Sequence, residues 1–213
     1  MTENITEAEL LDRARAMAPV VAERAQECIE LRRLPPQTEK EFQEAGFYKC
    51  LQPKRYGGFE CDFGFHTELG LEVGVGCASS GWNLSIMACH GWIMGMFPTD
   101  AQDDVWGDNH NATISSSFLA LGPPKVESDG DGFRLTARYG FSSGSDYCQA
   151  TILQVPMDLG NGIEPCFVML TREDYQVLDT WNANGLTGTG SHDLLIEDSY
   201  IPRHRILPVF QTR

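Results

Sequence analysis

Serine hydroxyls concentrate at the ends of two neighbouring strand-like stretches of this sequence, ATISSSFLA (112–120) and FRLTARYGFSSG (133–144). Serine is a poor strand former, so this concentration needs an explanation. The simpler one is that the serines make turns and solvate strand edges. The alternative is a polar wall of hydrogen-bond donors that faces a planar ligand. The serines concerned are Ser115, Ser116, Ser117, Ser142, Ser143 and Ser145.

Turn residues separate the two stretches. The intervening GPPKVESDGDG (122–132) holds a Pro-Pro pair and an Asp-Gly-Asp-Gly tandem. Asp-Gly between two strand-like runs is a strong hairpin signal, because glycine readily adopts the backbone that tight turns require. We therefore predict a β-hairpin built from both stretches, with the serines at the strand ends.

His90 is a second candidate for chemistry. It lies in GWNLSIMACHGWIMGMF (81–97), which is apolar on nearly all faces and predicts a buried helix. The simpler interpretation is a core histidine with one satisfied ring nitrogen. The functional interpretation is a donor or base directed into a cavity that Trp82 and Trp92 would line.

The segment GLTGTGSHD (185–193) contains glycine, threonine and serine as densely as a phosphate-binding loop does. No parallel strand–turn–helix unit surrounds it, so it is not a dinucleotide fingerprint. It is either an ordinary loop or a tight turn in which Thr189 or Ser191 offers a hydroxyl. His192 and His204 lack partners at metal-ligand spacing, so we expect surface or structural roles for them and no metal site.

Composition narrows the class of protein. A net charge of −14 over 213 residues disfavours nucleic acid and anionic membrane surfaces as partners. Seven scattered cysteines without a C-x-x-C pair predict no disulfide framework and a reducing compartment. The acidic N-terminus does not resemble a signal peptide, and no run is long enough to span a membrane. We expect a soluble cytoplasmic protein.

The periodicity of apolar residues changes once, near Asn109. Before it the pattern is helical, and after it short alternating runs and glycine turns predict an antiparallel sheet or small barrel. We therefore predict an α+β protein with a helical domain over 1–109 and a β domain over 110–213. Gly74 and Gly76 indicate close packing against another backbone, or fraying. The expected helices begin near Thr6, Thr38, Asp62, Ser79 and Pro98, with Glu9 and Glu41 completing capping boxes at the first two.

Three segments in this order resemble the acyl-CoA dehydrogenase superfamily: QPKRYGG (52–58), the strand ending in GFSSG, and GLTGTGSHDLLIEDSYIPRHRI (185–206). The ISSSF and GFSSGSDY motifs, with a histidine in the central helix, are more similar to one branch. That branch comprises the two-component flavin-dependent aromatic monooxygenases, including the oxygenases of 4-hydroxyphenylacetate and of a steroid-derived catechol precursor. The resemblance implies an acyl-CoA dehydrogenase-like helical domain followed by the β domain.

The same resemblance implies a chemistry. Reduced FMN or FAD, supplied by a separate flavin reductase, would react with oxygen to give a C4a-hydroperoxide that hydroxylates a phenolic substrate. By resemblance, Ser142 or Ser143 stabilises this species near the flavin N5 atom, and His90 holds the phenol oxygen. The residues implied to contact flavin are Phe141, Ser142, Ser143, Thr189 and Ser191. Those implied to contact substrate are Trp82, His90, Ser115, Ser116 and Ser117.

Two alternatives remain open from the sequence. One is an acyl-CoA dehydrogenase, although those enzymes usually carry Thr-Glu-Pro where this chain has Ser-Ser-Phe-Leu-Ala. The other is a non-catalytic homologue that serves as a binding or assembly domain. The family's C-terminal helical bundle covers the flavin and builds a homo-oligomer, a tetramer in full-length members. We expect this chain to lack that bundle, either as a fragment or as a shortened homologue. We therefore expect the 213-residue chain alone to be inactive and to bind flavin more weakly than micromolar.

Overall fold

The computed structural model describes residues 5–211, which form two compact units. The first unit contains the chain up to Gly95 together with Trp181–Gly190, and the second contains Met96–Thr180 and the chain from Ser191 onward. The last α-helix of the described residues ends at Trp106 and the first strand begins at Ile114, so the change from α-helices to strands falls where the sequence indicates. The compact units themselves meet earlier, between Gly95 and Met96.

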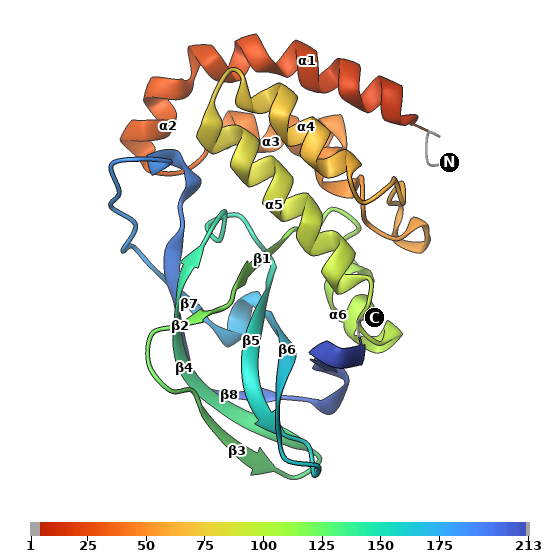
Figure 1. The fold of residues 1–213 in the computed structure, drawn as a ribbon, viewed down its shortest axis with the longest axis vertical. Helices are drawn as coiled ribbons and strands as arrows, with labels where there is room; N and C mark the ends of the chain where they lie inside the picture. Colours follow the sequence, from red (N-terminus) through yellow and green to blue (C-terminus); the bar gives the residue numbers. More distant parts are fainter. Residues whose placement is uncertain (1–4, 212–213) are drawn as a thin grey trace. The chain divides into compact units, whose positions relative to one another are not determined.

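The described residues of the first unit form five α-helices, among which α4 and α5 lie side by side (Figure 1). Their bounds are α1 Glu7–Glu23, α2 Ala25–Leu31, α3 Pro36–Ala45, α4 Phe65–Gly74 and α5 Ala78–Met94. The predicted capping box at the start of α1 is confirmed: the Glu9 N–H donates to Thr6 Oγ1 at 3.2 Å, and the Thr6 N–H donates to the Glu9 carboxylate at 2.8 Å. Arg24 separates α1 from α2 and lies at the C-terminal end of the first and the N-terminal end of the second.

Two predicted caps are wrong. Helix α3 begins at Pro36, which suits the first helical turn because its missing N–H would have no partner there. The side chains of Thr38 and Glu41 instead both accept hydrogen bonds from the guanidinium of Arg24, and the Arg24 Nη1 to Glu41 Oε2 distance is 2.6 Å. Asp62 does not cap α4 directly; its carboxylate accepts the N–H of Gly64, the residue that precedes the helix, at 2.9 Å.

Glycines let α4 and α5 approach closely, as the sequence predicts for this region. A Cβ on Gly81 of α5 would lie 2.5 Å from the Gly70 carbonyl oxygen and 2.6 Å from the Gly74 Cα of α4. A Cβ on Gly76 would lie 1.9 Å from the carbonyl oxygen of Ala18 in α1. These glycines therefore place backbone against backbone.

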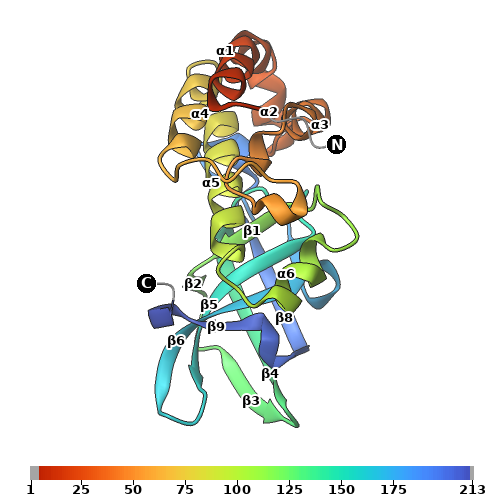
Figure 2. The same ribbon diagram turned by 90° about the vertical axis from the view of Figure 1, so that its right-hand side faces the viewer.

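The second unit contains helix α6 (Thr99–Trp106) and two sheets (Figure 2). The four-stranded sheet has the order β1 (Ile114–Ser117), β5 (Ala150–Asp158), β6 (Ile163–Thr171) and β9 (Ile206–Pro208). The five-stranded sheet contains β2 (Leu119–Ala120), β4 (Gly132–Ser142), β8 (His192–Ile201) and β7 (Gln176–Leu178) in this order, with β3 (Lys125–Asp129) also paired to β4. Apolar side chains from both sheets form one core, among them Leu153, Val155, Val168, Leu194 and Ile196.

The predicted hairpin is half correct. The Asp-Gly tandem does make a hairpin turn, but it joins β3 to β4, with Asp129 opposite Gly132. The serine strand β1 pairs in parallel with β5 of the other sheet, and only the short β2 after it pairs with β4. In this arrangement both buried hydroxyls of β1 have partners: Ser115 bonds Thr151 of β5 at 3.0 Å, and Ser117 donates to the Gly140 carbonyl of β4.

No helix between residues 5 and 211 is long and apolar enough to cross a membrane. Within the same range, no cluster of three or more His, Cys, Asp or Glu side chains could hold a metal ion.

Candidate functional site

Strand β4 ends in an irregular backbone. Its register with β8 shifts between Tyr139 and Ser142, and Phe141 in this interval has a φ of 62°. That conformation is uncommon for a bulky aromatic residue, and such strained positions concentrate at functional sites. The Phe141 side chain is 59% exposed, although it lies beside fully buried neighbours. The bulge therefore presents an aromatic ring at the surface of the second unit.

A pair of serines lies directly after this bulge. The hydroxyls of Ser143 and Ser191 are 2.7 Å apart, and both side chains are buried. Ser143 follows β4, and Ser191 precedes β8, so the two strands that pair over most of their length also bring these hydroxyls together. One hydroxyl donates to the other, and the accepting hydroxyl keeps its own hydrogen for another acceptor.

Two more hydroxyls in the same turn have no hydrogen-bond partner within the described part of the chain. Ser142 Oγ and Ser145 Oγ are both fully buried. A buried hydroxyl without a partner costs about 1–3 kcal/mol, so natural proteins rarely keep one without a reason. The turn therefore combines strain, an exposed ring and unused hydrogen-bonding capacity.

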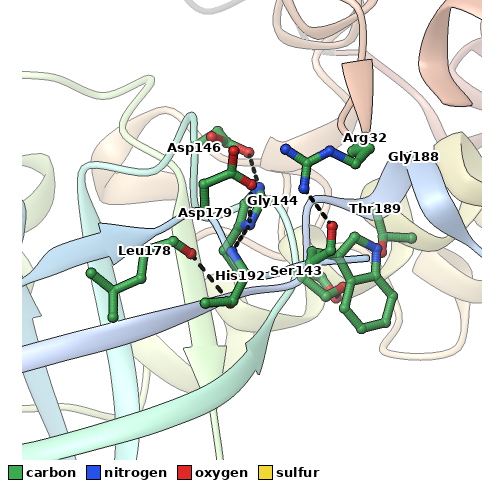
Figure 3. A network of polar contacts seen from close by, with 12 residues as sticks. Arg32, Ser143, Gly144, Asp146, Leu178, Asp179, Gly188, Thr189 and His192 are labelled. Atoms are coloured by element: carbon green, nitrogen blue, oxygen red, sulfur yellow. Dashed lines mark hydrogen bonds and ion pairs between the residues drawn. The ribbon is translucent and has the colours of Figure 1, made fainter. Parts of the chain in front are cut away.

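His192 follows Ser191 and is almost completely buried, which the sequence does not indicate. Its Nδ1 accepts the N–H of Thr180 at 3.2 Å. Its Nε2 lies 3.5 Å from a carboxylate oxygen of Asp146, and its Nδ1 lies 3.6 Å from one of Asp179. Figure 3 shows both carboxylates next to the ring. A surface role, one of the two expected for this residue, is thus wrong.

The serines of β1 lie differently. Ser115 and Ser117 are buried, and their hydroxyls are used in bonds between strands, whereas Ser116 is only half-buried. Ser115 and Ser117 therefore stitch β1 to its neighbours.

The remaining predicted site residues belong to the first unit. His90 is buried in α5 with an exposed fraction of 2%, whereas Trp82 on the same helix is 47% exposed. Thr189 ends a short 3₁₀ turn (Thr187–Thr189), and its hydroxyl donates to the carbonyl of Leu186 at 2.9 Å. The glycine-rich segment is therefore a tight turn, and it closes on itself through the threonine that was expected to contact flavin.

An apolar pocket of about 490 Å³ lies along α4 and α5. Trp82 forms part of its wall, with the hydroxyls of Thr67 and Ser85 as its polar groups. Its size and apolar lining suit a ring-containing organic molecule better than a phosphate. Its other lining residues are Gly70, Leu71, Gly74, Val75, Ala78, Gly81 and Leu186.

Residues 5–108 match the model of the acyl-CoA dehydrogenase N-terminal domain. The crystal structure of 3-HSA hydroxylase from Rhodococcus sp. RHA1 aligns with 94% of this chain at 35% identity and a TM-score of 0.88. The chain belongs to the acyl-CoA dehydrogenase superfamily. Its expected fold class, a helical domain followed by mainly antiparallel sheets, is confirmed.

Curated relatives from this superfamily are oxygenases. The chain is 37% identical over 198 residues to "Flavin-dependent monooxygenase, oxygenase subunit HsaA" of Rhodococcus jostii, covering 92% of this chain and 51% of that protein. It is 32% identical to "FADH(2)-dependent resorcinol hydroxylase, oxygenase component" of a Rhizobium species, covering 93% of this chain and 48% of that protein. The chain thus spans about half the length of these relatives.

Proposed function

We propose that this chain is the N-terminal and middle part of the oxygenase component of a two-component, flavin-dependent monooxygenase that hydroxylates a phenolic substrate. The observation that carries the proposal is the hydroxyl pair of Ser143 and Ser191 beside the strained, exposed Phe141. The names of the relatives support the same reaction class, because both curated relatives above are described as oxygenase subunits or components that depend on flavin. The expected partners are a separate flavin reductase and further copies of the same chain.

The residues at the end of β4 suit an isoalloxazine ring. A flat aromatic ring system packs against an exposed aromatic side chain such as Phe141. The N5 atom of the flavin can form a hydrogen bond with a hydroxyl, and Ser143 offers a hydroxyl directly after the end of β4. Ser142 and Ser145 add buried hydroxyls that lack partners in the described structure. The donor set fits reduced FMN or FAD equally.

When bound, reduced flavin would supply the activation of molecular oxygen. The role of this chain's residues is to hold and orient the reactants. Ser143 would orient the ring at N5, with Ser191 fixing the direction of its hydroxyl. His90 would accept the phenol proton or hold the phenol oxygen, which makes the ring more reactive toward electrophilic oxygen. The apolar side chains of α5 around His90 would keep water away from its contact with the phenol oxygen.

Binding of flavin tests the site directly. Oxidised and reduced FMN and FAD are titrated into the purified chain, into Ser143→Ala and into the control Ser128→Ala, which removes an exposed hydroxyl from β3. We expect weak but measurable binding to the unaltered chain, with a dissociation constant above 1 μM. Loss of one hydrogen bond should weaken binding roughly 5- to 150-fold in Ser143→Ala. Equal affinities of Ser143→Ala and Ser128→Ala would exclude Ser143 from the flavin site.

Turnover separates the roles of the two groups. With a flavin reductase and a phenolic substrate, Ser143→Ala in the complete protein should divert reductant to hydrogen peroxide and form less product per reductant. His90→Ala should lower the rate of hydroxylation while leaving flavin affinity unchanged. A His90→Ala variant that loses flavin affinity but hydroxylates bound substrate normally would reverse this assignment.

A further inference from the structure

His192 connects three separate pieces of the second unit. Its ring reaches Asp146 in the turn after β4 and the backbone of Thr180 after β7, and the residue itself begins β8. The side chain of Asp146 is 14% exposed, and that of His192 is 6% exposed. A buried ring with polar contacts on both nitrogens is held in one orientation, because any other orientation of the ring would leave a buried polar group without a hydrogen-bond partner.

The contacts also fix which nitrogen carries the proton. Nδ1 accepts the Thr180 N–H, so a neutral ring carries its hydrogen on Nε2. That hydrogen faces the Asp146 carboxylate. Thr180 is pinned in turn, because its hydroxyl accepts the N–H of Asp193 at 2.9 Å. The ring therefore bridges a fixed backbone position and a carboxylate in the serine turn.

This bridge lies directly beside the hydroxyl pair. Ser143 and Asp146 belong to the turn after β4, and their respective partners Ser191 and His192 are adjacent at the start of β8. The same two segments are thus joined twice, once by the two hydroxyls and once by the imidazole of His192 and the carboxylate of Asp146, which Figure 3 shows. Because the bulge interrupts the β4–β8 ladder just before this point, the regular backbone pairing does not set the spacing alone.

We propose that His192, held by Asp146 and Thr180, is a positioning residue that aligns the Ser143 hydroxyl for a bound flavin. This inference rests on the proposed function, since it needs flavin as the ligand of Ser143. His192 itself touches neither flavin nor substrate. It sets the separation between the serine turn and the start of β8, and through this the direction in which the hydroxyl pair points.

The test is a double-variant cycle on the full chain. The variants are His192→Asn, Ser143→Ala, the double variant, and the control His204→Asn, which makes the same exchange at a histidine that pairs with Asp104 in the same unit. Affinities for oxidised FMN and FAD are measured by fluorescence titration up to millimolar flavin, together with the visible absorption of the bound flavin. Far-UV circular dichroism confirms that each variant is folded.

We expect His192→Asn to weaken flavin binding roughly 5-fold or more and to shift the flavin absorption in the same direction as Ser143→Ala. Because His192 acts through Ser143, the double variant should bind within about twofold of Ser143→Ala alone. The control His204→Asn should match the unaltered chain. If His192→Asn does not fold, Asp146→Asn replaces it, since that change removes the charge next to Nε2 and keeps the shape of the side chain.

Two results would overturn the inference alone: unchanged binding in His192→Asn, or effects of His192→Asn and Ser143→Ala that multiply. An unaltered chain that binds neither flavin at millimolar concentration would overturn the proposed function and this inference together. The two failures are therefore distinguished by the unaltered chain.

Discussion

The close approach of α4 and α5 leaves no room for a side chain at Gly81. A Cβ there would lie 2.5 Å from the Gly70 carbonyl oxygen, whereas ordinary contact begins at 3.4 Å, so the helices must separate by about 1 Å. The atoms that this Cβ would meet all belong to the backbone of α4, so no side-chain rotation relieves the clash. Overpacking of this kind lowers the free energy of unfolding by about 1–3 kcal/mol. The higher helix propensity of alanine offsets about 1 kcal/mol of this loss.

Gly91 provides a matched control, because it lies in the same helix and receives the same substitution. A Cβ on Gly91 would have no neighbour closer than 3.7 Å, which is ordinary van der Waals contact. Gly91→Ala should therefore raise the free energy of unfolding by about 0.5–1 kcal/mol, whereas Gly81→Ala should leave it unchanged or lower it by up to about 2 kcal/mol. Urea unfolding followed by far-UV circular dichroism measures both. If Gly81→Ala is as stable as Gly91→Ala, the backbone contact does not limit the approach of the helices.

Two further predictions concern buried or paired carboxylates. Burial raises the pKa of Glu39, although hydrogen bonds such as that from Tyr48 at 2.5 Å oppose the shift. Because the folded pKa is raised, the contribution of this carboxyl group to stability is lost as pH rises through that pKa. Glu39→Gln should therefore raise the free energy of unfolding at neutral pH by on the order of 1 kcal/mol. A variant that is less stable at pH 7 would contradict this sign. Partial burial alone would raise the pKa of Asp104, but hydrogen bonds from His204 and Arg205 outweigh it and lower this pKa. The contribution of the carboxylate to stability is present above its unfolded pKa of about 3.9 and is lost as pH falls through the folded pKa. Asp104→Asn should therefore cost about 1–2 kcal/mol at pH 6 and less at pH 2. Urea unfolding at the two pH values gives the comparison, and an equal loss at both would show that the carboxylate charge is not involved.

The features that the sequence predicts correctly depend on neighbours within a few residues. The capping box of Thr6, the Asp-Gly turn and the close packing around Gly74 and Gly76 each follow from residue types close together in the chain. The same pattern fails at Thr38, where threonine and glutamate also stand three residues apart. Both are bound by Arg24, which comes from another helix and competes with the local cap.

The features that the sequence does not predict depend on contacts between residues far apart in the chain. Strand β1 pairs with β5, while Ser117 still donates to the Gly140 carbonyl of β4, and spacing along the chain does not distinguish these two neighbours. His192 stands between a serine and an aspartate, which is a typical surface context, and its burial requires Asp146 and Thr180 from elsewhere. Of the candidate site, Ser143, Ser191 and Phe141 were predictable by resemblance, but the bond that joins the two serines was not.

The segment Trp181–Gly190 belongs to the helical unit although it lies far along the chain, and this affects folding during synthesis on the ribosome. The carbonyl of Gly188 accepts hydrogen bonds from Cys28 and Asn83, and Arg32 donates to the carbonyl of Trp181 at 2.7 Å. The chain must therefore be extended to about residue 190 before the first helices find all their partners. Until then the surfaces of α2 and α5 that receive this segment remain open in the nascent chain. Because such distant contacts close slowly, the helical unit should complete its folding late, after most of the β-rich unit has emerged.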